Sequence, residues 1–213
     1  MAEAASVTKL QAPDKIPINL VLGDRVVDGA SIRPLSFQTF ADIISEAQGM
    51  TAPKTFEGRL KRLRMHRQVN YYMGANQVQL SIQEILQLPI PDARAISVKF
   101  DATDEGKPGK IIREGDGINQ AIVFELGTPI PTGAGKPSIK ELEFSAKTYG
   151  DIEDVMAAEN SIQQAAQLIA TIAKPLGSSL TLLPSWALSA ISVADGVTIS
   201  QVVLPRFLGS ADE

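Results

Sequence analysis

The sequence contains no cysteine and only one histidine, His66, among its 213 residues. The absence of cysteine excludes disulfides, thiolate nucleophiles and thiolate metal ligands, and it fits a reducing compartment. A transition-metal site or a Ser-His-Asp triad would have to use His66, which lies among arginines in RLKRLRMHRQ without an acid beside it. We therefore interpret His66 as a histidine on a helix surface and expect no metal, no cofactor and no enzymatic activity.

Long apolar runs are also missing. The longest mainly apolar stretch, 165–172, is too short to span a bilayer. The first 15 residues lack a basic segment followed by an apolar run, which is the pattern of a signal peptide. These features predict a cytoplasmic protein without a targeting signal or membrane association.

The charge is small and unevenly distributed. The formal net charge is −4, but residues 1–110 carry 14 Lys and Arg against 12 Asp and Glu, whereas residues 111–213 carry 6 against 12. The two parts therefore have charges of +2 and −6. A nucleic-acid-binding protein needs a basic face to replace phosphate counterions, so this distribution argues against a nucleic-acid partner for the whole molecule.

One basic cluster stands out in this acidic chain. Five cationic side chains lie within nine residues: Arg59, Lys61, Arg62, Arg64 and Arg67. On a helix they would leave a narrow apolar stripe, so the cluster fits either a solvated helix neutralised by acids elsewhere in the fold or a docking surface for an acidic partner. If the cluster binds a partner, the candidate binding residues are Arg59, Arg62, Arg64 and Arg67.

Other polar motifs have ordinary structural explanations. Asp101, Asp104 and Glu105 resemble part of a calcium loop but lack the ligand at the twelfth position. The acids Asp151 and Asp154 lie near an expected helix N-terminus, where exposed amides stabilise carboxylates without any catalytic role. The aromatic residues in apolar patterns are expected in the core. They are Trp186, Tyr149, Phe144 and Phe207.

Residues 1–15 have no periodicity and predict a flexible N-terminal arm, followed by a first α+β module over 16–100. Its expected elements follow from the alternation of apolar and polar residues, from helix-capping residues, and from the glycines and prolines that end helices and strands. In order, they are strands at 16–22 and 25–32, helices at 34–48 and 56–73, an extended stretch at 78–80, a helix capped by Ser81, and a helix or strand at 92–100.

Residues 101–119 are charged and rich in glycine and proline, which predicts a linker. The same order of elements and breakers then returns over 120–208, and this repetition predicts a second, related module. Its expected elements are strands at 122–126 and 139–144, a turn at 128–137, helices beginning near Thr148 and at 161–176, a helix at 186–191 and a final apolar segment after Asp195.

Two unrelated halves of generic α+β design are the alternative to this duplication. The predicted fold class is therefore α+β, with two tandem related modules that each contain a β-hairpin followed by about three helices.

The second module resembles a known family. The strands VFELGTPI and IKELEF, the acid-bearing helix after Thr148, and LTLLPSWALSAISVADGVTISQVVLPRFL are similar to the small tail assembly chaperones of tailed phages, a group that includes Mu-like and related myophage proteins. Pro184, Ser185, Asp195 and Phe207 match the breaker, serine, aspartate and phenylalanine of that group. The family's arginine and proline after the hairpin are present only in the first half, as Arg33 and Pro34. The usual single copy also occurs here as two.

The resemblance implies a non-enzymatic protein of the infected bacterial cytoplasm that coats the tape measure protein during assembly of the tail tube. It makes the tape measure protein the expected partner, leaves the tail tube protein and self-association open as further contacts, and implies apolar grooves that accept amphipathic helices. Two tandem modules would raise the effective concentration of the second contact. The alternative is a baseplate or tail-terminus subunit that persists in the virion tail.

Overall fold

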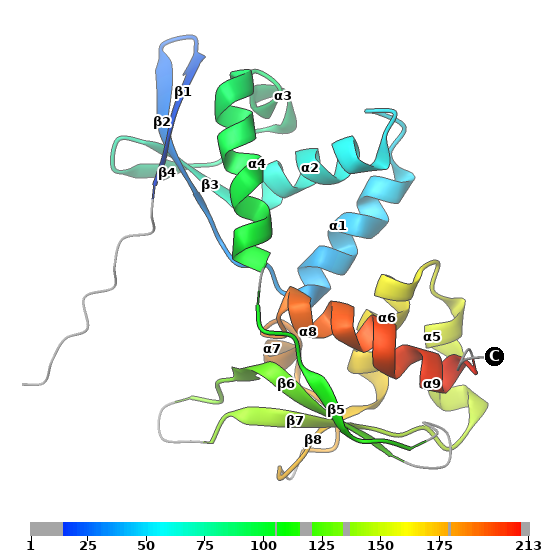
Figure 1. The fold of residues 1–213 in the computed structure, drawn as a ribbon. Coiled ribbons are helices and arrows are strands. Elements are labelled where there is room, and N and C mark those ends of the chain that lie inside the picture. Colours follow the sequence, from blue (N-terminus) through cyan, green and yellow to red (C-terminus); the bar gives the residue numbers. More distant parts are fainter. Residues whose placement is uncertain (1–14, 105, 116–120, 134–136, 179, 210–213) are drawn as a thin grey trace, which may run out of the picture.

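The computed structural model describes residues 15–104, 106–115, 121–133, 137–178 and 180–209. The chain folds into two antiparallel four-stranded sheets with helices packed on each, so the predicted α+β class is confirmed (Figure 1). The predicted N-terminal arm lies outside the described residues except for Lys15, and part of the predicted linker, 116–120, also lies outside them.

The first sheet has the strand order β1-β2-β3-β4. Its strands are β1 (Ile16–Leu22), β2 (Arg25–Ile32), β3 (Val69–Met73) and β4 (Asn76–Val78). The hairpin β1–β2 is the one predicted, and it turns at Gly23, whose φ of +66° is a left-handed conformation that favours glycine. Alternating residues of β1, including Ile18 and Leu20, are buried against helix α4.

Four helices accompany this sheet. They are α1 (Phe37–Gly49), α2 (Phe56–Arg67), α3 (Ile82–Ile85) and α4 (Ile90–Asp104). Ser81 caps α3, as the sequence predicts, and Ser36 caps α1, since each hydroxyl accepts a hydrogen bond from a backbone amide of the first turn. The segment 92–100, left open as a helix or a strand, is helical within α4.

The predicted helix over 56–73 is wrong at its C-terminal end. The helix ends at Arg67, and the residues from Val69 onward form β3, which pairs with β2. Aromatic and β-branched residues such as Val69 and Tyr71 favour a strand that fits a half-buried sheet, and this environment overrides the helical spacing. Gly74 therefore forms the β3–β4 turn at φ +61° rather than the end of a helix.

The second sheet has the order β5-β6-β7-β8 (Figure 1). Its strands are β5 (Lys110–Arg113), β6 (Ile122–Ile130), β7 (Ile139–Phe144) and β8 (Ala173–Pro175). Strand β7 has the predicted bounds, and β6 continues past its predicted end at 126 to Ile130, so residues 128–130 of the predicted turn belong to the strand.

The predicted linker over 101–119 is also wrong in its described parts. Helix α4 runs to Asp104, and β5 pairs with β6. Between them the backbone packs tightly, because a Cβ at Gly109 would lie 2.3 Å from the carbonyl oxygen of Glu125 in β6. The glycines that suggested a flexible linker thus permit close backbone contact with β6.

The helices of the second half cover one face of its sheet. They are η1 (Tyr149–Asp151), α5 (Glu153–Ala157), α6 (Ser161–Ile172), α7 (Ser185–Leu188), α8 (Val193–Thr198), the π-helical segment η2 (Ile199–Val203) and α9 (Leu204–Leu208). The predicted helix over 161–176 ends earlier, at Ile172, because residues 173–175 pair with β7 as β8. The helix predicted at 186–191 is the shorter α7.

The order of elements is similar in the two halves. In each, a hairpin is followed by two helices, and a third strand then pairs with the second strand, so that β1-β2-β3 corresponds to β6-β7-β8. Asp92, in the first turn of α4, accepts a hydrogen bond from the amide of Asn19 in β1 at 2.8 Å. Asp195, in the first turn of α8, accepts one from the amide of Gly127 in β6 at 2.8 Å. Descent of both halves from one ancestor stays a hypothesis.

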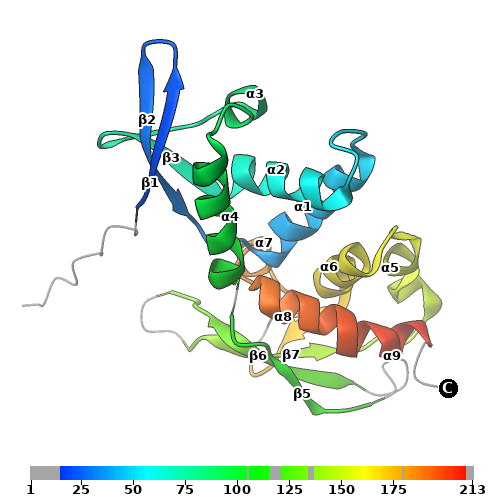
Figure 2. The ribbon, with the colours of Figure 1, turned by 45° about the horizontal axis from the view of Figure 1, so that its top comes forward.

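Helix α1 joins the two halves, because it packs beside α6 and α8 of the second half (Figures 1 and 2). The amide of Phe37 donates to the carbonyl of Ile191 at 2.8 Å, and the Phe37 ring is buried in the core of the second sheet. A Cβ at Gly196 would lie 1.9 Å from Cγ of Phe37, so only a glycine leaves room for this ring. The modules predicted as 16–100 and 120–208 therefore meet through α1, whose Phe37 and Ala41 belong to the core of the second half, whereas the first sheet has a core of its own.

The predicted core aromatics divide into two pairs. Phe144 and Phe207 are buried, as predicted. Trp186 and Tyr149 were wrongly placed in the core, since 48% of Trp186 and 62% of Tyr149 is exposed. Both are in short helices, α7 and η1, where the apolar pattern is too brief to show which side faces the core.

Candidate functional site

The basic cluster of α2 is largely used inside the fold. The guanidinium of Arg59 donates to the carbonyl oxygens of Ala47 at 2.6 Å, Pro53 at 3.1 Å and Lys54 at 3.0 Å. Arg62 donates to the carbonyl of Ala52 at 3.4 Å. These acceptors belong to the C-terminal turn of α1 and to the loop that follows it, where free carbonyls carry partial negative charge. Arg59 therefore fastens this loop to α2.

The other cations of α2 also have partners. Arg64 is buried with only 8% exposed; its Nε donates to Gln68 at 2.9 Å and its guanidinium lies 4.3 Å from the ring centre of Phe100. Arg67 pairs with Glu46 of α1. Lys61 pairs with Glu57 one turn earlier at 2.8 Å.

Arg64 is mostly buried, with 8% exposed, and it also lines a hollow between α2 and α4. Binding of a partner by Arg59, Arg62, Arg64 and Arg67 stays a prediction. The alternative was neutralisation by acids elsewhere in the fold, whereas the acceptors found are backbone carbonyls and an acid of α1. The signal that sequence reasoning missed is the short loop between two helices, whose carbonyls need donors.

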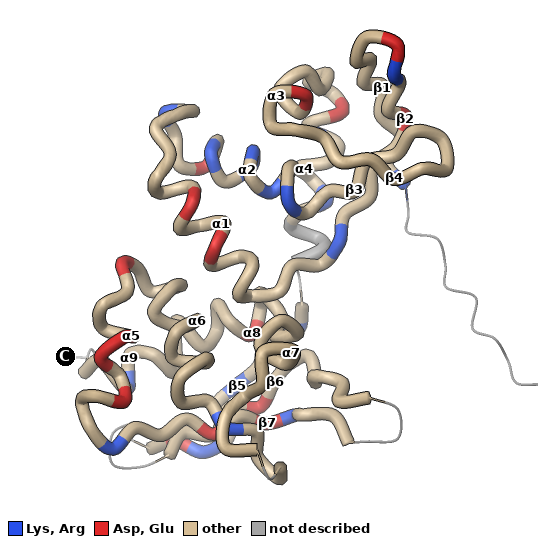
Figure 3. Tube along the Cα trace, turned by 180° about the vertical axis from the view of Figure 1, so that it is seen from behind, with Lys and Arg blue, Asp and Glu red and all other residues tan. Residues whose placement is uncertain are grey.

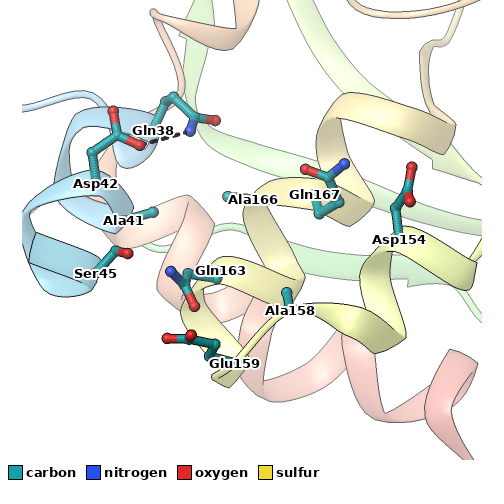
Figure 4. Close-up of a pocket in the computed structure, with 10 residues that line it drawn as sticks. All are labelled: Gln38, Ala41, Asp42, Ser45, Asp154, Ala158, Glu159, Gln163, Ala166 and Gln167. Atoms are coloured by element: carbon teal, nitrogen blue, oxygen red, sulfur yellow. Dashed lines mark hydrogen bonds between the residues drawn. The ribbon is translucent and has the colours of Figure 1, made fainter. Parts of the chain in front are cut away.

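A polar cleft of about 390 Å³ lies between α1 and the α5–α6 pair (Figure 4). Its lining combines small alanine side chains with glutamines and acids, contributed by α1, by α5 and α6, and by the loop between α5 and α6. The lining residues are Gln38, Ala41, Asp42, Ser45, Asp154, Ala158, Glu159, Gln163, Ala166 and Gln167. This lining holds three carboxylates and no Lys or Arg, so it would favour a cationic group over an anionic one.

The acids near this cleft have different environments. Gln38 donates to Asp42 at 3.2 Å, as the dashed line in Figure 4 shows. Asp151, just outside the cleft, accepts from the amides of Lys147 at 2.8 Å and Thr148 at 2.9 Å, and these hydrogen bonds hold the pKa of its carboxyl below the usual value. Asp151 is therefore a helix-capping residue. Within the described ranges, no group of three Asp, Glu, His or Cys residues could hold a metal ion.

A second hollow, the α2–α4 groove, has a volume of about 410 Å³. Phe100 and Leu60 contribute its apolar floor, Val98 stands exposed at its edge, and the other residues supply mainly positive charge. The lining residues are Glu57, Leu60, Lys61, Arg64, Arg94, Ser97, Val98 and Phe100. With three cations and one acid, the groove suits an apolar segment that also carries acidic side chains.

The loop between β8 and α7, with the start of α7, exposes four large apolar side chains, which we call the 176–186 segment. Each is between 39% and 48% exposed: Leu176, Leu180, Leu182 and Trp186. Leu183, between them, is buried in the second core and anchors the segment. Several large apolar side chains exposed close together in the chain are typical of a surface that binds another protein.

The described part of the chain contains no helix that is both long and apolar enough to cross a membrane. His66 lies on α2, partly exposed, as expected for a helix-surface histidine.

Comparison with known proteins gives no assignment: no protein-family model, no curated protein and no solved structure matches this chain.

Proposed function

We propose that this chain is a non-enzymatic protein-binding protein that acts as a tail assembly chaperone of a tailed phage, in the cytoplasm of the infected bacterium. Its partner in this proposal is the tape measure protein, whose long amphipathic helices it keeps soluble while the tail tube polymerises. The resemblance of 120–208 to small tail assembly chaperones supports the family, and the surface of that same half supports binding.

The observation that carries the proposal is the exposed 176–186 segment. Burial of apolar area is the main favourable term in protein association, and tryptophan is enriched among the residues that dominate binding energy. Trp186 and Leu182 are held on a loop anchored by the buried Leu183, so they are available without unfolding of the second half. An amphipathic helix could cover them with its apolar face.

The test is co-expression with the tape measure protein of the same phage, followed by measurement of how much tape measure protein stays soluble and co-purifies. Trp186→Ala should weaken binding by about 2 kcal/mol, which is roughly thirtyfold in affinity. Leu182→Ala should weaken it less. Leu86→Ala is the matched control, because Leu86 is similarly exposed but lies after α3 in the first half.

Equal binding by the wild type, Trp186→Ala and Leu182→Ala would contradict the role of this segment. Failure of the wild-type chain to keep tape measure protein soluble would contradict the chaperone function itself. Mass spectrometry of purified particles separates a chaperone from a baseplate or tail-terminus subunit, since only a subunit persists in the virion in stoichiometric amounts.

A further inference from the structure

Helix α4 presents an exposed stripe in which a cation lies between two apolar side chains. Ile90, Arg94 and Val98 are spaced four residues apart, which places them on one face of the helix. Ile90 is 76% exposed and Val98 68% exposed, and Arg94 is also exposed. Arg94 and Val98 line the α2–α4 groove together with Lys61.

The segment η1–α5 presents the opposite pattern, with an acid between two apolar side chains. Glu153 and Met156 are spaced by three residues on one face of α5, and Tyr149 precedes them in the 3₁₀ turn η1. Tyr149 is 62% exposed and Met156 47% exposed, and Glu153 is exposed as well. Asp154 adds a second exposed acid.

The central charges of both stripes are available. Among the described residues, neither the guanidinium of Arg94 nor the carboxylate of Glu153 makes a hydrogen bond or an ion pair. Figure 3 shows basic positions on α2 and α4 and acidic positions on α5. This local difference follows that of the whole chain, whose first 110 residues have a charge of +2 and whose remaining residues have −6.

We propose that the α4 stripe of one molecule binds the η1–α5 stripe of a second copy of this chain. Arg94 then meets Glu153, and Ile90 and Val98 cover the apolar surfaces of Tyr149 and Met156. The two stripes cannot meet within one molecule, because α4 and α5 lie apart in different halves (Figures 1 and 2) and α1 fixes the halves together. Exposed apolar area and complementary charge both favour the contact.

This contact is heterologous, since it joins two different surfaces. Each added molecule leaves one α4 stripe and one η1–α5 stripe free, so copies add head to tail until a ring closes or a filament grows. This self-association involves only copies of this chain and needs no tape measure protein. It can therefore be refuted while the proposed chaperone function holds, and the chaperone function can be refuted while the self-association holds.

The first experiment measures the mass of the purified full chain against concentration by analytical ultracentrifugation, at low and high salt. The wild type should form oligomers whose mean mass rises with concentration and falls at high salt, because the screening length shortens from about 10 Å at 0.1 M to about 3 Å at 1 M. Arg94→Glu and Glu153→Arg should each lower the association constant about tenfold, because an attractive pair becomes repulsive.

Two control variants make the same changes in charge elsewhere. Lys140→Glu on β7 and Asp24→Arg in the β1–β2 turn both alter exposed side chains outside the two stripes. Both should associate like the wild type. All the changed side chains are at the surface, so each variant should fold. Circular dichroism of each variant checks that its fold is intact.

The second experiment mixes Arg94→Glu with Glu153→Arg at equal concentration. In the mixture every contact between unlike copies joins opposite charges, either the wild-type pair or its charge-reversed counterpart, so the mixture should recover the growing oligomers that neither variant forms alone. The double variant R94E/E153R restores opposite charges across every contact and should recover the larger oligomers. These two results together identify a head-to-tail contact through these residues.

Three results would overturn the proposal. The wild type could remain a monomer over the whole concentration range at low salt. The two single variants could associate as strongly as their controls, or their mixture could associate no more strongly than either variant alone. A wild-type monomer whose Arg94→Glu variant binds tape measure protein less tightly would assign the α2–α4 groove to that partner and not to a second copy.

Discussion

Replacing Asp195 with alanine should destabilise the protein much more than the same change at Asp92, the corresponding position of the first half. Asp195 is fully buried and accepts hydrogen bonds from the amides of Gly127 at 2.8 Å and Thr128 at 3.3 Å, and from the hydroxyl of Ser192 at 2.8 Å. The hydroxyl can rotate toward another acceptor, but the two amides are fixed in β6. Asp195→Ala therefore leaves two amides without their acceptor, that of the half-buried Gly127 and that of the exposed Thr128.

Each such donor costs about 1–3 kcal/mol, so the expected loss in the free energy of unfolding is about 2–6 kcal/mol. For a chain of this size the thermal midpoint should fall on the order of 10 °C. Asp92 accepts from one amide, that of Asn19, at a partly exposed position where water can replace it. Asp92→Ala should cost only about 0.5–1.5 kcal/mol.

Urea denaturation and thermal melts followed by circular dichroism measure both losses. Asp195→Asn keeps one acceptor oxygen, so its free energy of unfolding should lie between those of Asp195→Ala and the wild type. This variant can be measured even if Asp195→Ala does not fold. Equal losses for Asp195→Ala and Asp92→Ala would refute the reasoning, because it depends on a buried carboxylate that holds two amides at Asp195 and a partly exposed one that holds a single amide at Asp92.

Three further predictions concern other parts of the fold. Arg59→Ala should lower the free energy of unfolding by on the order of 2 kcal/mol, whereas Lys61→Ala should change it by less than about 0.5 kcal/mol. Equal effects of the two changes in urea denaturation would argue against the role of Arg59 in fastening the α1–α2 loop. Amide and hydroxyl donors hold the pKa values of the Glu84 and Asp151 carboxyls below their usual range in the folded protein. The stability that these two carboxylates give to the fold is therefore complete above about pH 4, and it is lost as the pH falls through their folded pKa values. The double variant E84Q/D151N should therefore lose less stability between pH 7 and about pH 3 than the wild type, and an unchanged loss would contradict this. Gly196→Ala should unfold the protein or free α1 from the second half, detected as faster limited proteolysis of α1, because the new methyl group overlaps the aromatic ring packed there.

Local patterns in the sequence predicted the elements that depend on neighbouring residues. The hairpin β1–β2, the strand β7 and the capping of α3 by Ser81 were all predicted from alternation of apolar and polar residues, turn residues and capping residues. Strands β3 and β8 were predicted as the ends of helices, because each is short and becomes a strand only by pairing with β2 or β7. That pairing is a long-range effect without a local signal.

The candidate site was harder to predict, since the roles of its side chains depend on what lies opposite them. The basic spacing of α2 was clear from the sequence, but the carbonyls that bind Arg59 become neighbours only when α1 and α2 pack as a hairpin. The exposure of Tyr149 and Trp186 could not be predicted either. Aromatic residues are usually buried, and the helices that carry these two are only three and four residues long.

The packing of α1 on the second half has a consequence for synthesis of the chain on the ribosome. Phe37 emerges 159 residues before Gly196, the residue it packs against, since 196 − 37 = 159. At about 5–20 residues per second, this interval is roughly 10–30 s. During that time the nascent first half can pair β1, β2 and β3 and can pack α1 on α2, but the face of α1 that carries Phe37 and Ala41 has no partner. The first half must therefore wait for the second to complete its fold, and a nascent chain arrested near residue 110 should bind cellular chaperones through α1.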